Sequence, residues 1–123
     1  MDIKLFDSEW KLMELLWEQP QPISAKALSL LAAERIGWNK NTTYTVVKKL
    51  VEKGAIQREE PGFICHVILQ REDAQRGETQ SLISRIFDGS KQAFFSHLLA
   101  DENLSQEDLT ALKAMIEEKS DES

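Results

Sequence analysis

Thiol and imidazole groups, the soft metal ligands, are scarce in this chain of 123 residues, which contains one cysteine and two histidines. The single Cys65 excludes an internal disulfide framework. Cys65 and His66 adjoin in a predicted strand, where successive side chains point to opposite faces, so they cannot easily share one ion. The sequence also lacks a glycine-rich phosphate loop and any recognisable pairing of a nucleophile with a base. We therefore expect no metal, no cofactor and no catalytic site.

Long hydrophobic runs are missing as well. No apolar stretch approaches the ~20 residues that a transmembrane helix needs, and the first ten residues, MDIKLFDSEW, contain no signal-peptide hydrophobic region. We expect a soluble, cytoplasmic protein without a membrane partner. Because 41% of the residues are hydrophobic, there is enough apolar material for one domain, or for one small domain and an appendage.

Net positive charge is also lacking, since the formal charge is −6. Residues 1–70 contain nine Lys and Arg against nine Asp and Glu, whereas residues 71–123 contain six against twelve, so the second half carries the whole imbalance. A local cluster of positive charge can bind phosphate even when the rest of a chain repels it. The first half offers such residues, namely Lys40, Lys48, Lys49, Lys53 and Arg58. The pattern favours two functional halves, which we assign as domains 1–70 and 71–123.

Residues 38–56, WNKNTTYTVVKKLVEKGAI, predict an amphipathic helix. Asn39 is a suitable N-cap, whose side-chain oxygen can accept a hydrogen bond from the N–H of Thr42. Gly54 suits the left-handed turn that ends a helix. Helical spacing of the apolar positions predicts an inward face, formed by Thr43, Val46, Val47 and Leu50. The opposite face carries polar side chains, namely Asn41, Thr42, Tyr44, Thr45, Lys48 and Lys49.

The polar face of this helix has chemistry suited to the major groove of DNA. Asparagine pairs with adenine, threonine offers a hydroxyl or a methyl group, and lysine neutralises phosphate. We predict that the base-reading residues are Asn41, Thr42, Tyr44 and Thr45. We predict that the phosphate contacts are Lys40, Lys48, Lys49 and Arg58. Judged on this stretch alone, an ordinary solvated helix face is an equally good interpretation.

The segments around this helix predict a winged helix-turn-helix domain. An apolar stripe from Trp10 to Trp17 predicts a first helix over residues 8–18, and the prolines that follow break it. Residue 23 is expected to start a short strand, and Ser24 to cap a second helix over 25–36. After Gly54, an alternating segment, a Pro-Gly turn and the β-branched run 63–69 predict a hairpin. Three helices followed by a hairpin wing give this architecture, although the acidic wing tip, residues 59–63, is a poor phosphate binder.

Three further helices are expected within residues 72–87, 90–99 and 105–119. They carry more large apolar residues than short helices can bury against one another, which indicates a partner, and a second copy of the chain is the simplest one. The predicted dimer interface consists of Leu82, Ile83, Ile86, Phe87, Phe94, Phe95, Leu98, Leu99, Leu109, Leu112, Met115 and Ile116. Packing of these helices on the winged helix is the alternative. The expected fold is therefore mainly α with a small β-hairpin: a winged helix-turn-helix domain followed by a three-helix dimerisation domain.

The chain resembles the penicillinase repressor family, the BlaI/MecI/CopY group of bacterial winged-helix repressors. The resemblance covers nearly the whole chain and rests on the order and spacing of several segments, namely EWKLMELLW (9–17), Trp38, the Thr42-x-x-Thr45 pair, LVEKGAI (50–56), IFDGS (86–90) and NLSQEDLTALKAMIEEK (103–119). It implies a homodimeric repressor, not an enzyme, whose partner is a double-stranded operator with inverted repeats of a TACA/TGTA-type core. It also implies that the predicted base-reading residues occupy the base-reading positions of the family.

Several residues depart from the pattern of that family. Asn41 stands where Lys is frequent, Thr43 where an aliphatic residue is common, and Tyr44 where a basic or small polar residue is common. Phe63 stands where the wing often has a basic residue after its glycine. These departures leave the operator sequence open.

A sensor protease is a further partner that the resemblance raises. The protease-sensitive members are cut at an Asn-Phe bond, whereas the aligned bond here is His97-Leu98, so we do not assume this partner. The C-terminal EEKSDES lacks the cysteine cluster of the copper-responsive members. The alternative function is a dimeric winged-helix protein-interaction adaptor without specific DNA binding. We favour a repressor, because paired lysines on a threonine-rich helix contribute little to a protein interface.

Overall fold

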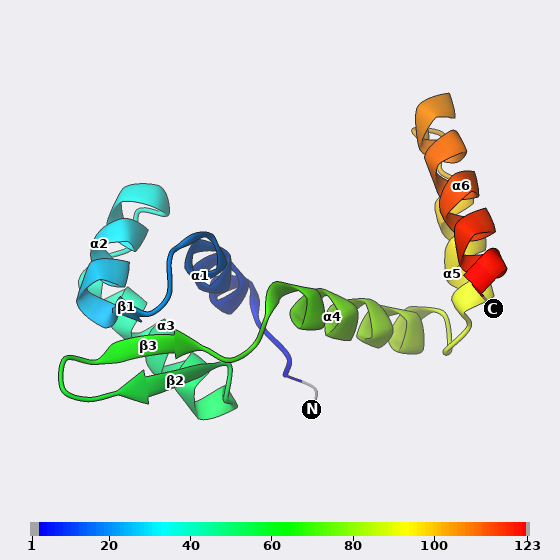
Figure 1. Cartoon of the computed structure of the whole chain (residues 1–123). Helices are drawn as coiled ribbons and strands as arrows, with labels where there is room; N and C mark the ends of the chain where they lie inside the picture. The colour runs from blue at the N-terminus through cyan, green and yellow to red at the C-terminus, as the bar shows by residue number, and fades with distance from the viewer. Residues whose placement is uncertain (1–2, 123) are drawn as a thin grey trace. The chain divides into compact units, whose positions relative to one another are not determined.

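A computed structural model describes residues 3–122, which form six helices and one small sheet (Figure 1). The helices are α1 (Asp7–Glu18), α2 (Ala25–Arg35), α3 (Lys40–Lys53), α4 (Arg71–Ile86), α5 (Lys91–Leu99) and α6 (Gln106–Glu122). The strands are β1 (Ile23–Ser24), β2 (Ile56–Glu59) and β3 (Ile64–Val67). The mainly helical class, with a hairpin directly after the third helix, confirms the predicted fold class.

The chain forms two compact units, which divide between Ser81 and Leu82 within α4. The first unit contains α1 to α3, the sheet and most of α4. The second unit contains the end of α4 together with α5 and α6. The domain boundary after residue 70 coincides with the start of α4 and stays a prediction.

The core of the first unit lies between α1, α2, α3 and the sheet. Its fully buried large side chains come from all of these elements and include Leu12, Met13, Leu16, Leu28, Val47, Leu50 and Ile56. The inward face predicted for α3 is confirmed, because Thr43, Val46, Val47 and Leu50 are all buried. Trp17 joins α1 to the segment before α4, since its indole N–H donates to the carbonyl of Leu69 at 2.9 Å.

Short-range hydrogen bonds set the ends of the helices as the sequence predicts. Asn39 Oδ1 accepts the N–H of Thr42 at 2.8 Å. Gly54 ends α3 with a φ of 83°, a left-handed conformation that favours glycine. Ser24 Oγ accepts the N–H of Ala27 at 3.1 Å and thereby starts α2. These bonds satisfy backbone groups that the helix itself leaves without partners.

The sheet is antiparallel, with strand order β1-β3-β2. Cys65 at its centre pairs with Ile23 on one side and with Arg58 on the other. The hairpin of β2 and β3 is therefore anchored to the segment before α2, and the N–H of Ala25 also donates to the carbonyl of Phe63 at 2.9 Å. Cys65 is fully buried while His66 is partly exposed, as the alternation of a strand requires.

The second unit leaves many apolar side chains open to solvent. Neither α5 nor α6 contains a buried residue. Within the predicted dimer interface only Ile83 is buried, and another five residues are partly buried, namely Leu82, Phe87, Phe94, Leu98 and Leu112. The other six are exposed, namely Ile86, Phe95, Leu99, Leu109, Met115 and Ile116. The rings of Phe87 and Phe94 meet edge to face with centroids 5.7 Å apart.

Candidate nucleic-acid interface

The exposed face of α3 gathers short polar side chains at its beginning and two lysines further along. Asn41, Thr42 and Thr45 are exposed, as are Lys48 and Lys49. The hydroxyl of Thr45 donates to the backbone carbonyl of Asn41 at 2.9 Å, which orients the side chain along the helix. The helix thus presents amide and hydroxyl groups within its first two turns, where a helix in the major groove has its base contacts.

Thr43 lies on the opposite face and is fully buried. Its hydroxyl donates to the backbone carbonyl of Asn39 at 3.3 Å, so the buried polar group has a partner. This bond explains how the inward face of α3 tolerates a threonine.

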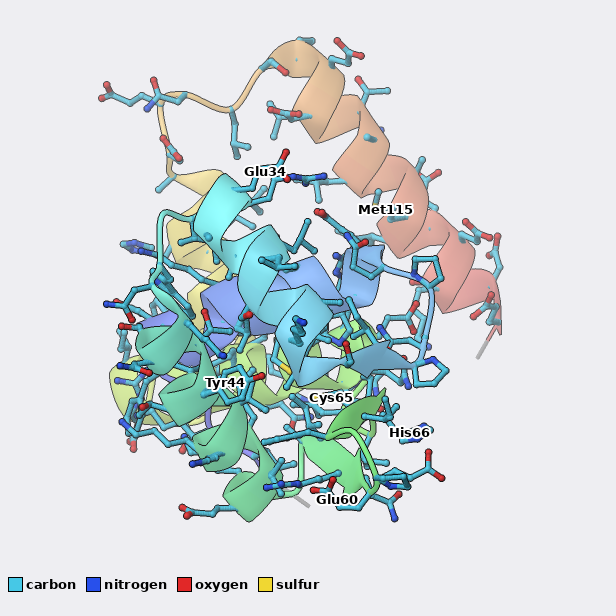
Figure 2. All side chains as sticks on the ribbon, turned by 90° about the vertical axis from the view of Figure 1, so that its left-hand side faces the viewer. Glu34, Tyr44, Glu60, Cys65, His66 and Met115 are labelled. Atoms are coloured by element: carbon cyan, nitrogen blue, oxygen red, sulfur yellow. The ribbon has the colours of Figure 1, made fainter. Side chains whose placement is uncertain are left out.

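Tyr44 lies at the junction between α3 and the hairpin and is only partly exposed (Figure 2). Its ring meets that of Phe63 edge to face, with centroids 5.8 Å apart. Lys40 Nζ is 5.7 Å from the centroid of the tyrosine ring. Two of the departures from the family pattern, Tyr44 and Phe63, are therefore in contact with each other, and the wing orients a predicted base-reading side chain.

Arg58 contacts two residues of the wing tip, Glu60 and Phe63. The guanidinium carbon of Arg58 is 3.7 Å from the ring centroid of Phe63, and its Nε donates to Glu60 Oε2. Glu60 Oε1 accepts the N–H of Phe63 at 3.0 Å. The backbone bond from Phe63, followed by the bond from Arg58, lowers the pKa of the Glu60 carboxyl below its ordinary value. The guanidinium predicted to contact phosphate is thus paired with a carboxylate of the same hairpin.

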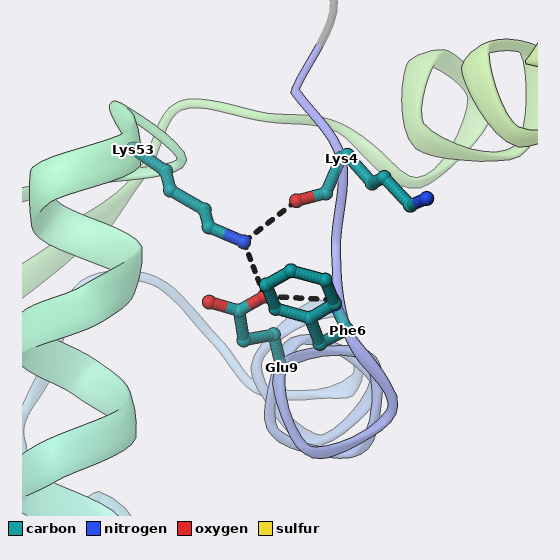
Figure 3. Close-up of polar contacts among 4 residues, drawn as sticks. All are labelled: Lys4, Phe6, Glu9 and Lys53. Carbon is teal, nitrogen blue, oxygen red and sulfur yellow. Dashed lines mark hydrogen bonds and ion pairs between the residues drawn. The ribbon is translucent and has the colours of Figure 1, made fainter.

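Lys53, the last residue of α3, contacts residues near the start of α1 and does not belong to the exposed polar face (Figure 3). Its ammonium donates to Glu9 Oε1 at 2.5 Å and to the carbonyl of Lys4 at 2.7 Å, and it lies 4.2 Å from the ring centroid of Phe6. Glu9 is 1% exposed, and its Oε1 also accepts the N–H of Phe6 at 2.7 Å. This cluster ties the C-terminal end of α3 to the start of α1.

Sequence reasoning missed the role of Glu9. The one available signal was its place in the first turn of a helix, where glutamate often caps the backbone. Nothing in the local pattern indicated that this carboxylate would be buried or that Lys53 would be its partner, because 44 residues separate them.

Three further features of residues 3–122 concern metal ligands, membrane spans and the buried thiol. In that part of the chain, no three His, Cys, Asp or Glu residues lie close enough together to hold a metal ion. Its helices include none with both the length and the apolar character needed to cross a membrane. Burial raises the pKa of the Cys65 thiol to about 11, which keeps the thiol protonated at neutral pH.

The three helices α1 to α3, with the polar face of α3 exposed, and the hairpin wing that follows them define a winged helix-turn-helix protein. A solved structure of the DNA-binding domain of the repressor BlaI has a similar fold, with a TM-score of 0.53 at 20% identity over 59% of this chain and 90% of that one. The profile described as penicillinase repressor matches residues 5–118. The chain belongs to the penicillinase repressor family, which confirms the family predicted from sequence. Members of this family are transcriptional regulators, so the chain is not an enzyme.

The sequence alignments with two relatives cover most of this chain. An uncharacterized 16.5 kDa protein of Latilactobacillus sakei is 29% identical over 91% of this chain and 77% of its own length. The methicillin resistance regulatory protein MecI of Mammaliicoccus sciuri is 21% identical over 97% of this chain and 100% of its own length. The similarity to MecI therefore includes the segments of both compact units.

Proposed function

We propose that this chain is a homodimeric transcriptional repressor that binds an inverted-repeat operator through α3. The observation that carries the proposal is the division of α3 into a buried apolar face and an exposed face of amide, hydroxyl and ammonium groups. Membership of the penicillinase repressor family supports the same function. In this role α3 lies in the major groove and the second unit joins two copies.

The proposed base contacts come from the first two turns of α3. Asn41 and Thr42 stand nearest its N-terminus, and Thr45 lies one turn further on the same exposed face. Tyr44 would meet the groove from the side of the wing, with its ring oriented by Phe63. Amide and hydroxyl groups at these places can exchange hydrogen bonds with base edges.

The proposed phosphate contacts are the lysines on the same side of the molecule. Lys48 and Lys49 are exposed beyond the base-reading turns, and Lys40 stands at the start of the helix. These contacts are independent of sequence and set affinity and its salt dependence. Arg58 would join them only after separating from Glu60.

The proposed dimer interface is the apolar surface of the second unit. Its exposed side chains include Ile86 and Met115, each 62% exposed. Burying a large apolar side chain completely contributes about 1.5–3 kcal/mol, so covering six half-exposed ones on each protomer contributes on the order of 10 kcal/mol. That gain is comparable with the ~4–15 kcal/mol that association costs in lost translational and rotational freedom. Covering this surface with a second copy of the chain therefore offsets much of the cost of association.

Selection of bound duplexes from a random pool, with the full chain at modest ionic strength, tests the proposal. We expect an inverted repeat whose half-sites lie one or more helical turns apart, ~34 Å per turn, and sedimentation as a dimer at micromolar concentration. If the folded chain retains no duplex, DNA binding is refuted and the protein-interaction adaptor is the alternative to test. If it sediments as a monomer, the dimer is refuted.

A further inference from the structure

We infer that Glu60 limits the affinity of this chain for DNA. It pairs with Arg58 at the wing tip and thereby keeps the Arg58 guanidinium from contacting a DNA phosphate. The inference rests on the proposed function and deepens it by naming the residue that keeps the wing from adding affinity. We call the contacts among Arg58, Glu60 and Phe63 the wing clasp.

The wing clasp holds its arginine from two sides. Glu60 Oε2 accepts the Nε–H of Arg58, and the ring of Phe63 covers the guanidinium at 3.7 Å. The other oxygen of Glu60 accepts the N–H of Phe63 at 3.0 Å, so the same carboxylate fixes both partners. The side chains of Arg58 and Glu60 are 42% and 53% exposed, which leaves the guanidinium within reach of an anion should the clasp open.

The backbone of Phe63 adopts an unusual conformation at the wing tip. Its φ is 50°, a left-handed conformation that bulky residues seldom adopt. In this conformation the ring of Phe63 contacts both Arg58 and Tyr44. These contacts and the bond to Glu60 offset the cost of the strained backbone.

The clasp lies beside the surface proposed to face the duplex. The contact between Phe63 and Tyr44 joins the wing tip to the first turns of α3, so a released Arg58 would stand next to the DNA backbone. In the closed clasp, the charge of Arg58 is matched by that of Glu60. Because phosphate contacts are independent of sequence, opening the clasp should strengthen binding to every duplex by the same factor.

Glu60→Gln is the direct test, measured on the selected duplex and on a scrambled duplex of equal length. The amide oxygen can still accept the N–H of Phe63, while the charge that holds Arg58 is removed. We expect affinity to rise about threefold to tenfold at 100 mM salt on both duplexes. We also expect the slope of log affinity against log salt to steepen by about 0.9, the value for one added phosphate contact.

Two further variants separate the clasp from a general change in charge. Glu59→Gln removes the same charge one residue earlier, but Glu59 contacts His66 at 2.9 Å and does not hold Arg58. We expect it to leave the salt slope unchanged. Adding Arg58→Ala to Glu60→Gln is expected to abolish both the gain in affinity and the steeper salt slope.

Three outcomes would overturn the inference. Equal effects of Glu60→Gln and Glu59→Gln would reduce the gain to general electrostatics. A flatter salt slope for Arg58→Ala alone would mean that Arg58 already contacts phosphate in the wild type. If the folded wild-type chain binds neither duplex, both the proposed function and this inference are refuted. The first two outcomes, in contrast, leave the proposed function intact.

Discussion

Replacing Lys53 with methionine is expected to destabilise the first unit by about 2–4 kcal/mol. The ammonium of Lys53 is the cationic partner of the buried Glu9 carboxylate, whose Oε2 has no hydrogen-bond partner within the described residues. Methionine retains much of the side-chain length and removes the charge. The variant therefore leaves a carboxylate in a nearly dry site without its counter-ion.

The magnitude follows from the burial of the two partners. Removing one member of a fully buried ion pair costs about 3–5 kcal/mol, because the remaining charge stays desolvated. Glu9 is 1% exposed but Lys53 is 27% exposed, so partial screening by water reduces this cost. The contact between Lys53 and the ring of Phe6 adds about 0.5–1 kcal/mol that methionine largely loses.

Urea denaturation followed by tryptophan fluorescence is the appropriate assay, because all three tryptophans, Trp10, Trp17 and Trp38, lie in the first unit. Chain concentration must be kept constant, since any association adds to the apparent stability. Arg76→Met is the matched control, because Arg76 pairs with Asp73 at 3.3 Å on the surface and should lose less than about 1 kcal/mol.

A second variant distinguishes charge from packing. Glu9→Gln combined with Lys53→Met removes both charges while the glutamine oxygen can still accept the N–H of Phe6. We expect this double variant to recover most of the stability lost in Lys53→Met. If Lys53→Met costs no more than Arg76→Met, or if Glu9→Gln gives no recovery, the buried ion pair is not what stabilises this junction.

Four other predictions concern the interface, the dimer and the buried thiol. Lys49→Ala should weaken binding to all duplexes alike and flatten the salt slope by about one unit, and an unchanged slope would remove Lys49 from the phosphate contacts. Asn41→Ala or Thr42→Ala should lose about 1–3 kcal/mol of discrimination between selected and scrambled duplexes, and equal losses on both would argue against base reading. Phe95→Asp with Met115→Asp should sediment as a monomer, which a persistent dimer would contradict. The Cys65 thiol has its pKa raised from 9.0 to about 11 in the fold, so its stabilising contribution is complete below pH 9 and lost as the pH rises to 11. Between pH 8 and 11 the wild type should therefore lose roughly 2–3 kcal/mol more stability than Cys65→Ala when both chains are denatured with urea.

Local signals explain why so much of the fold could be predicted from sequence. The cap of α3 joins Asn39 to Thr42, and the cap of α6 joins Ser105 to Asp108, in both cases across three residues. Gly54 acts through its own backbone dihedral angle. Such features depend on neighbours in the chain, so their residue types and spacing are sufficient to predict them.

The contacts at the wing tip could not be predicted from such local signals. Arg58 was predicted to contact phosphate because it is a basic residue beside the hairpin turn. Its contacts with Glu60 and Phe63 depend on the shape of the turn, and the contact of Phe63 with Tyr44 depends on packing of the hairpin against α3. A pattern of residue types contains neither of these.

The sequence by itself determined the helices, the hairpin and the division of α3 into apolar and polar faces, because periodicity and caps act over a few residues. Only the tertiary structure decided which of the positive charges on and beside α3 already have partners. Lys53 is paired with Glu9 from α1, and Arg58 with Glu60 at the wing tip, whereas Lys48 and Lys49 remain on the exposed face. The physical reason is that a charged side chain can bind DNA only if folding has not already placed an opposite charge beside it. For Lys53 that opposite charge, Glu9, lies 44 residues away in the sequence.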